Sequence, residues 1–103
     1  MPDLPELDRQ LAGAAERFGT PAYVYSADTV AARLAHLRDH FGRWFAVSFA
    51  VKSNPNPGLL DWMRGRLDYL DISSGGELAL ARQAGWDPGR ISFTGPAKRA
   101  PEL

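Results

Sequence analysis

The chain has 103 residues, 45% of them hydrophobic and 23% charged, which is typical of one small globular domain and not of a disordered protein. Twelve basic residues balance twelve acidic ones, so the charge excludes the basic surface that a nucleic-acid or anionic membrane partner would need. No cysteine, secretory signal or membrane-length apolar run is present, which excludes disulfides and thiol catalysis within the chain and leads us to expect a cytoplasmic protein.

Residues 1–43 are expected to be a lead-in of two helices separated by a short β segment. Apolar residues at helical spacing predict a first helix over about residues 5–18, which a Gly-Thr-Pro turn ends. Residues 21–25 are a short β-prone segment. Ser26 then caps a second helix, whose apolar stripe ends at Gly42.

An apolar run from Trp44 to Val51, rich in valine and aromatic residues, leads directly to Lys52. Such a run predicts a strand buried on both faces. The period of two places its bulky side chains on one side and its small ones on the side that leads to the lysine. We therefore expect a reactive amine at the end of a strand, where α/β enzymes place their chemistry. The alternative is a lysine that only returns the chain to water.

Strands and helices alternate from residue 44 onward, with connections of a few residues. Asn56 begins a helix, residues 68–72 form a second strand, a Ser-Ser-Gly-Gly-Glu run begins another helix, and residues 91–93 form a third strand. This order is typical of right-handed βαβ units with parallel strands. Residues 44–103 are therefore predicted to be the first βα units of an α/β (β/α)8 TIM-type barrel. Because such a barrel takes about 250 residues, we expect the chain to be the amino-terminal portion of a larger protein.

Three polar features follow the predicted strand ends, namely Lys52, Asp71 and the Gly-Pro-Ala-Lys turn at residues 95–98. The carboxyl ends of parallel strands meet at one edge, so these groups should surround one pocket. The runs that contain them, in this order, resemble the start of the pyridoxal-phosphate-dependent amino acid decarboxylases of the alanine racemase-like fold, the family of diaminopimelate, ornithine and arginine decarboxylases. The runs are FAVKSN at 49–54, DISSGGEL at 71–78 and ISFTGPAK at 91–98.

The resemblance implies that Lys52 holds pyridoxal 5′-phosphate as an aldimine, because a primary amine condenses with the cofactor aldehyde and can be exchanged for the substrate amine. The cofactor then serves as the electron sink when the α-carboxylate leaves. The resemblance further implies a lyase of amino acid metabolism whose substrate is a diaminopimelate-like, basic or carrier-bound amino acid. It also implies a homodimer that completes the active site.

Two acidic residues are further candidates. The resemblance places Asp71 close to the cofactor, and since a lone buried carboxylate is costly, Lys52 is its expected partner. The alternative is that Asp71 faces a helix amide or water. The resemblance places Glu77 in the cofactor region as well, but Ser74 and Glu77 also form an S-x-x-E capping box, in which the glutamate bonds back to the cap amide.

No metal site is expected. His36 and His40 have the i, i+4 spacing of zinc ligands, but Leu37 stands where an H-E-x-x-H motif has its glutamate. A solvated or partly packed pair is the better interpretation. The aromatic residues of the second half are expected in the core; they are Trp44, Phe45, Phe49, Trp62 and Trp86.

Two other functions stay open beside the decarboxylase. Racemases of this fold tend to follow the lysine with Ala-Asn-Ala-Tyr-Gly, whereas Ser-Asn-Pro-Asn follows it here at residues 53–56. A non-catalytic pyridoxal-phosphate-binding or interaction protein on the same barrel is the third possibility. In either enzyme the phosphate cradle and the carboxylate facing the pyridine nitrogen would lie beyond Leu103, so we expect this chain alone to be inactive.

Overall fold

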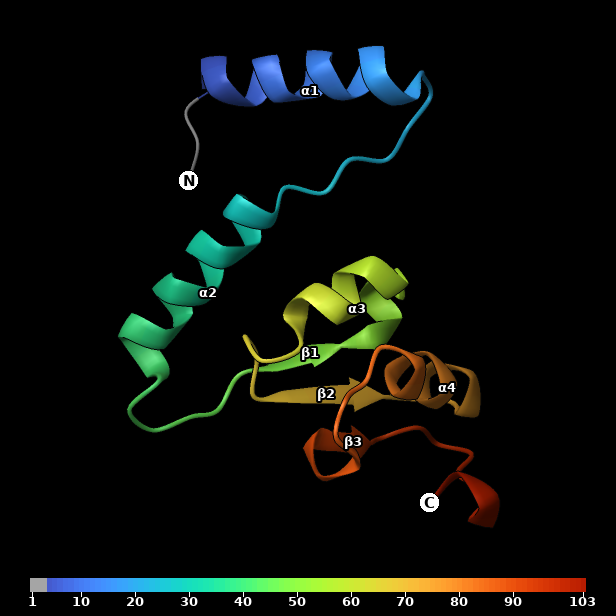
Figure 1. Cartoon of the computed structure of the whole chain (residues 1–103). Helices are drawn as coiled ribbons and strands as arrows, with labels where there is room; N and C mark the ends of the chain where they lie inside the picture. Colours follow the sequence, from blue (N-terminus) through green and yellow to red (C-terminus); the bar gives the residue numbers. More distant parts are fainter. Residues whose placement is uncertain (1–3) are drawn as a thin grey trace. The chain divides into compact units, whose positions relative to one another are not determined.

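The computed structural model describes residues 4–103, and the chain divides into two compact units, Met1–Arg43 and Trp44–Leu103 (Figure 1).

The first unit contains helices α1, Leu4–Phe18, and α2, Ala27–Phe41. Both helices are confirmed close to their predicted bounds. Ser26 caps α2, since its Oγ accepts a hydrogen bond of 3.3 Å from the backbone N–H of Thr29. The predicted β segment is wrong, because residues 21–25 form no strand. A strand requires a hydrogen-bonded neighbour, and residues 4–43 contain no other strand that could pair with it.

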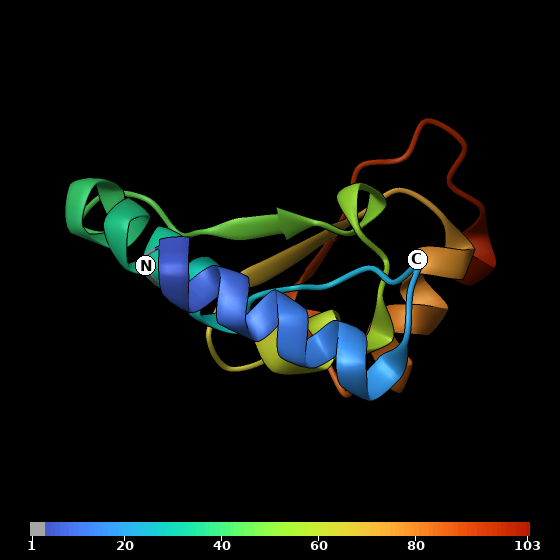
Figure 2. The same cartoon turned by 90° about the horizontal axis from the view of Figure 1, so that it is seen from above.

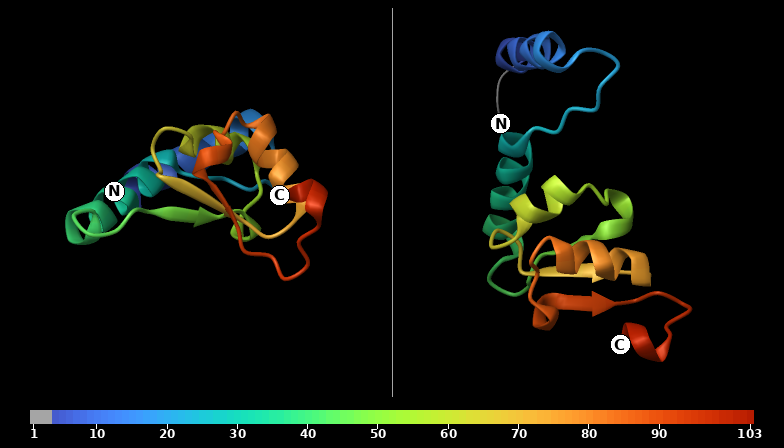
Figure 3. Two further views of the ribbon diagram at one scale, coloured as in Figure 1. Left: turned by 90° about the horizontal axis from the view of Figure 1, so that it is seen from below. Right: turned by 45° about the vertical axis from the view of Figure 1, so that its right-hand side comes forward.

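The second unit is a three-stranded parallel sheet in the order β1-β2-β3, as the sequence predicts. Its strands are β1 Ser48–Ala50, β2 Tyr69–Ile72 and β3 Ile91–Phe93. The helices are α3 Pro57–Met63 and α4 Gly75–Gln83, and the 3₁₀ turns are η1 Val51–Ser53, η2 Pro88–Arg90 and η3 Ala100–Glu102. Helices α3 and α4 both lie on one side of this sheet (Figures 2 and 3).

Side-chain caps begin both helices of this unit where the sequence predicts. Asn56 Oδ1 accepts from the Leu59 N–H at 3.2 Å, and Ser74 Oγ accepts from the Glu77 N–H at 3.1 Å. Helix α3 ends at Met63. No helix among residues 4–103 has the length and apolarity needed to cross a membrane.

The core of the second unit lies between the sheet and its helices. Its fully buried large side chains are Val51, Leu60, Leu70 and Ile72. Burying one such side chain stabilises a fold by roughly 1.5 to 3 kcal/mol. Trp86 is also buried, as predicted, and its Nε1–H donates to the Leu60 carbonyl oxygen at 2.9 Å, which ties the segment after α4 to α3.

The strand that leads to the lysine is shorter and more exposed than predicted. It spans only Ser48–Ala50, and Trp44 and Phe45, expected in the core, are 70% and 66% exposed. Strand β1 begins only at Ser48 because the N–H of Val47, the residue before it, is bonded to a side chain and not to the backbone of the next strand. Asp68 Oδ2 accepts this N–H at 2.8 Å. In this unit β1 is also an edge strand, so only β2 adjoins it.

Candidate functional site

Within residues 44–103 both α-helices lie on one face of the sheet, and the candidate site lies on the other face, called here the helix-free face (Figures 2 and 3). Leu70 and Ile72 of β2 are 0% and 1% exposed on the helix side. Because side chains alternate along a strand, Asp71 between them lies on the opposite face. The strand register pairs Ala50 with Asp71 and Asp71 with Ser92, so these three side chains share the helix-free face.

Two hydroxyl groups of the β3 region hold the Asp71 carboxylate. Ser92 Oγ donates to Asp71 Oδ1 at 3.0 Å, and Thr94 Oγ1 donates to Oδ1 at 3.0 Å and to Oδ2 at 3.2 Å. The partner expected from the sequence was Lys52, but no hydrogen bond or ion pair joins Asp71 to Lys52 among the described residues. The hydroxyls of Ser92 and Thr94 are the favoured partners because the β3 region already holds them beside Asp71. A lysine side chain would lose rotamer freedom to reach the same carboxylate.

Lys52 lies in the 3₁₀ turn η1 that follows β1, two residues after Ala50, and its side chain is exposed. Hydrogen bonds within the loop fix this turn: Ser53 Oγ donates to the Ala50 carbonyl at 2.7 Å, and the Asn54 N–H donates to the Val51 carbonyl at 3.0 Å. Within residues 4–103 the Lys52 amine makes no hydrogen bond or ion pair. The turn is therefore held in place while the amine remains available for a covalent bond.

Glu77 bonds one residue earlier than a capping box requires. Its Oε1 accepts from the Ser73 N–H at 3.3 Å, and both carboxylate oxygens accept from Ser73 Oγ at 3.0 Å. The cap residue Ser74 keeps its half of the motif by accepting the Glu77 N–H. The expected bond to the cap amide is thus replaced by bonds to Ser73, whose hydroxyl adds a second donor. Glu77 fixes the connection between β2 and α4.

The ends of β2 and β3 are joined by a close backbone contact. The Thr94 N–H donates to the Ile72 carbonyl at 2.9 Å. Beyond it Gly95 is buried, and a β-carbon built there would lie 2.3 Å from the Ser73 carbonyl oxygen. Only glycine fits this position without a shift of the backbone. This contact holds Thr94, and with it the Asp71 carboxylate, in one place.

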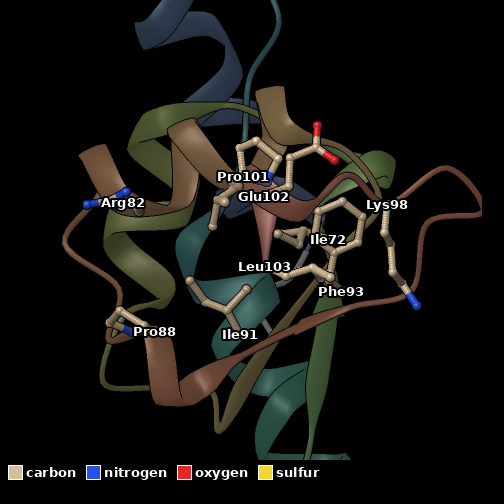
Figure 4. A pocket seen from close by; sticks show the side chains of 10 residues that line it. Ile72, Arg82, Pro88, Ile91, Phe93, Lys98, Pro101, Glu102 and Leu103 are labelled. Atoms are coloured by element: carbon tan, nitrogen blue, oxygen red, sulfur yellow. The ribbon is translucent and has the colours of Figure 1, made fainter.

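Lys98, at the end of the predicted third feature, does not join this group. It borders a cavity of about 460 Å³ that also contains Ile72, Ile91 and Phe93, which lie on the helix side of the sheet. The apolar side chains point into this cavity, while the Lys98 amine and the Arg82 guanidinium point away from its centre (Figure 4). The cavity therefore lies on the opposite side of the sheet from Asp71.

The two histidines of α2 bond within their own helix. His40 Nδ1 donates to the His36 carbonyl oxygen at 2.8 Å, and the two ring centroids lie 4.3 Å apart. Within the described residues, no group of three or more His, Cys, Asp or Glu side chains could hold a metal ion.

Ser92 and Thr94 are the two polar residues of the site that our sequence reasoning did not single out. The sequence contains a pattern that could have identified them, because alternation along residues 91–94 places positions 92 and 94 on the same face. The parallel register then places that face next to Asp71.

Comparison with known proteins assigns the chain to a family. Residues 27–103 match the family described as pyridoxal-dependent decarboxylase, pyridoxal binding domain. The chain is 42% identical over 89 residues to diaminopimelate decarboxylase of Aquifex aeolicus, covering 86% of this chain and 21% of that protein. It is 34% identical over 94 residues to the L-glutamyl-(BtrI acyl-carrier protein) decarboxylase of Niallia circulans, covering 91% and 22%.

A lysine/ornithine decarboxylase of Selenomonas ruminantium is 30% identical over 93 residues, covering 90% of this chain and 23% of that protein. Among solved structures, the crystal structure of AQ1208 from Aquifex aeolicus matches with a TM-score of 0.74 and 41% identity, over 86% of this chain and 22% of the other. The chain thus spans about a fifth of the length of the relatives it matches.

Proposed function

This chain belongs to the pyridoxal-dependent decarboxylases, and from that premise we propose that Lys52 is the residue to which pyridoxal 5′-phosphate binds covalently. Two observations together carry the proposal. The Lys52 amine has no bonding partner among the described residues, and the Asp71 carboxylate is fixed on the helix-free face. Lys52 follows β1, and Asp71 lies in the carboxyl-terminal half of the neighbouring parallel strand β2. In α/β folds ligands bind at that edge of the sheet.

The residues present suit the cofactor. Covalent attachment needs a primary amine at the edge of the site, which Lys52 supplies, and a positive nitrogen in the site needs a nearby anion, which Asp71 supplies. Ala50 is in register with Asp71, and its small side chain leaves room on the helix-free face between Lys52 and Asp71. When bound, the cofactor supplies the electron sink for loss of a carboxylate.

Each acidic residue has its own part in the proposal. Asp71 balances positive charge on the Lys52 nitrogen, and its hydroxyl donors keep its carboxylate in one orientation. Glu77 acts through Ser73 by holding the turn at the end of β2, so it is a positioning residue and does not itself react.

We propose removal of the α-carboxylate from an amino acid as the reaction, with a diaminopimelate-like substrate as the first choice. This choice is supported by relatives of that name at 42%, 41% and 39% identity. Basic and carrier-bound amino acids are the next classes, because relatives at 30% and 34% identity are named for them.

We also propose that the chain functions as the amino-terminal portion of a longer enzyme, since each relative is four to five times the length that the chain covers. The first unit is the lead-in, and residues 44–103 are the first βα units of the cofactor-binding barrel. The homodimer and the cytoplasmic location expected from the sequence remain part of this proposal.

The reaction class can be tested with the purified full-length protein. Incubation with meso-diaminopimelate should release carbon dioxide, with a rate that depends on added pyridoxal phosphate, and the Lys52→Ala variant should release none. Conversion of meso-diaminopimelate into another of its stereoisomers, without release of carbon dioxide, would identify a racemase. Cofactor binding with neither product, across diaminopimelate, lysine, ornithine and carrier-bound glutamate, would favour a non-catalytic binding protein.

A further inference from the structure

We propose that Thr94, assisted by Ser92, is a positioning residue that presents the Asp71 carboxylate to the cofactor-bearing amine without neutralising it. This inference rests on the proposed function of Lys52. The proposed function gives roles to Lys52, Asp71 and Glu77, and this inference adds a role for two hydroxyl groups.

The two hydroxyls leave part of the carboxylate open. Thr94 has one hydroxyl proton to share between the two carboxylate oxygens of Asp71, since its Oγ1 lies 3.0 Å from Oδ1 and 3.2 Å from Oδ2. Ser92 donates only to Oδ1. An ionised carboxylate offers about four acceptor sites. The remaining accepting capacity therefore lies mainly on Oδ2, which can receive a further N–H donor.

The donors are neutral, and this distinguishes the site from an ion pair. No cationic side chain pairs with Asp71 among residues 4–103. A guanidinium in the same place would orient the carboxylate but would also cancel its charge. Two hydroxyls orient it and leave the full negative charge to act on a positive nitrogen nearby.

The position of the hydroxyls is set by the backbone. Ser92 is the register partner of Asp71, and the Thr94 N–H is bonded to the Ile72 carbonyl. Immediately afterwards the buried Gly95 lies against Ser73. Thr94 is therefore held on both sides along the chain, so its hydroxyl has little freedom to leave Asp71. This rigidity is what a positioning residue requires.

The experiment is a spectroscopic titration of the full-length apoprotein with pyridoxal phosphate, which reports the dissociation constant and the visible spectrum of the bound cofactor. Thr94→Val keeps the shape but removes the donor, and we expect a dissociation constant about tenfold higher, the size of one hydrogen bond to a charged group. Thr94→Ser keeps the donor and should restore binding to near the wild-type value. Thr29→Val is the matched control, because among the described contacts its hydroxyl bonds only to Ser26, the cap of helix α2.

The Asp71→Asn background separates positioning from a general structural effect. If Thr94 acts through Asp71, then Thr94→Val should cause little further loss of affinity once Asp71 has been replaced. An equal loss in both backgrounds would overturn the inference, and so would wild-type affinity and spectrum in Thr94→Val. If Thr94→Val fails to fold in thermal unfolding, Ser92→Ala replaces it, with a smaller loss of affinity expected and the same dependence on Asp71.

Failure of the proposed function gives a different result. A wild-type protein that shows no bound-cofactor spectrum at all would overturn both the role of Lys52 and this inference. A wild-type spectrum that is unaffected by Thr94→Val overturns only the inference.

Discussion

The backbone of Gly95 lies so close to that of Ser73 that a β-carbon at position 95 would stand 2.3 Å from the Ser73 carbonyl oxygen. This contact joins the ends of β2 and β3 beside the candidate site. Since Ser73 is also the residue that Glu77 holds, the contact links the start of α4 to the loop that carries Thr94.

Gly95→Ala should therefore destabilise the full-length protein. Relief of the overlap requires a shift of backbone, and such overpacking costs about 1 to 3 kcal/mol. Gly13→Ala is the control: a β-carbon there meets nothing within 4 Å, and in a helix interior alanine is favoured over glycine by roughly 0.5 to 1 kcal/mol. Denaturant unfolding of both variants measures the difference. Equal stability of Gly95→Ala and wild type would show that the two strand ends can separate freely.

Glu77 allows its structural and chemical roles to be separated. Glu77→Ala removes the acceptor for both donors of Ser73, its N–H and its hydroxyl, and we expect a loss of about 1 kcal/mol, as for a helix cap. Glu77→Gln keeps one carbonyl oxygen as acceptor, so its stability and its turnover should stay near wild type. A collapse of turnover in Glu77→Gln at unchanged stability would instead place Glu77 in contact with the reacting groups.

Asp71→Asn tests the charge beside the lysine. The shape is kept and the amide oxygen still accepts from Ser92 or Thr94, so folding should be nearly unchanged. A nearby anion favours a protonated nitrogen. Its removal should therefore move the pH at which the visible band of the lysine-bound cofactor titrates to lower values. An absorbance titration checks this, and an unmoved midpoint would mean that Asp71 has no electrostatic contact with the cofactor.

Acid should loosen the turn η3 through Glu102. The backbone N–H of Arg99, and then its side chain, hydrogen bond to Glu102 and hold the pKa of that carboxyl below its ordinary value. Because the folded pKa is the lower one, the stabilisation is fully present above the unfolded pKa and is lost as the pH falls through the folded pKa. Intrinsic amide exchange slows in acid, so the readout is the protection factor of the Arg99 amide, corrected for that slowing, and it should fall over that acid range. Glu102→Gln cannot titrate there, so an identical acid response in this variant would assign the effect to another group.

Local sequence signals predicted the helices well because their determinants are local. Ser26, Asn56 and Ser74 each cap a helix through bonds to residues three positions away, and such bonds depend on little else in the chain. The parallel sheet also followed from alternation of short elements. The extent of β1 did not follow from local signals, because it depends on a residue 21 positions further along the chain. The Asp68 carboxylate accepts a hydrogen bond from the Val47 N–H.

The candidate site was predicted in its parts but not in its contacts. Asp71 was identified from its strand, yet its partners are Ser92 and Thr94 on the next strand. Both have hydroxyls on the correct face, but the choice between them and Lys52 depends on the strand register and on the turn η1, which takes the lysine out of the alternating pattern. Spacing along the chain cannot supply either of these facts.

The central claim, that Lys52 bears the cofactor, has a direct test in the full-length protein. Reduction with borohydride in the presence of pyridoxal phosphate should make the linkage permanent, and peptide mapping should then find the pyridoxyl group on Lys52. The other lysine of this chain, Lys98, points away from the centre of the helix-side cavity and serves as an internal control. A label on Lys52 and none on Lys98 is the predicted result, whereas a label on Lys98, or none on this chain, would contradict the account.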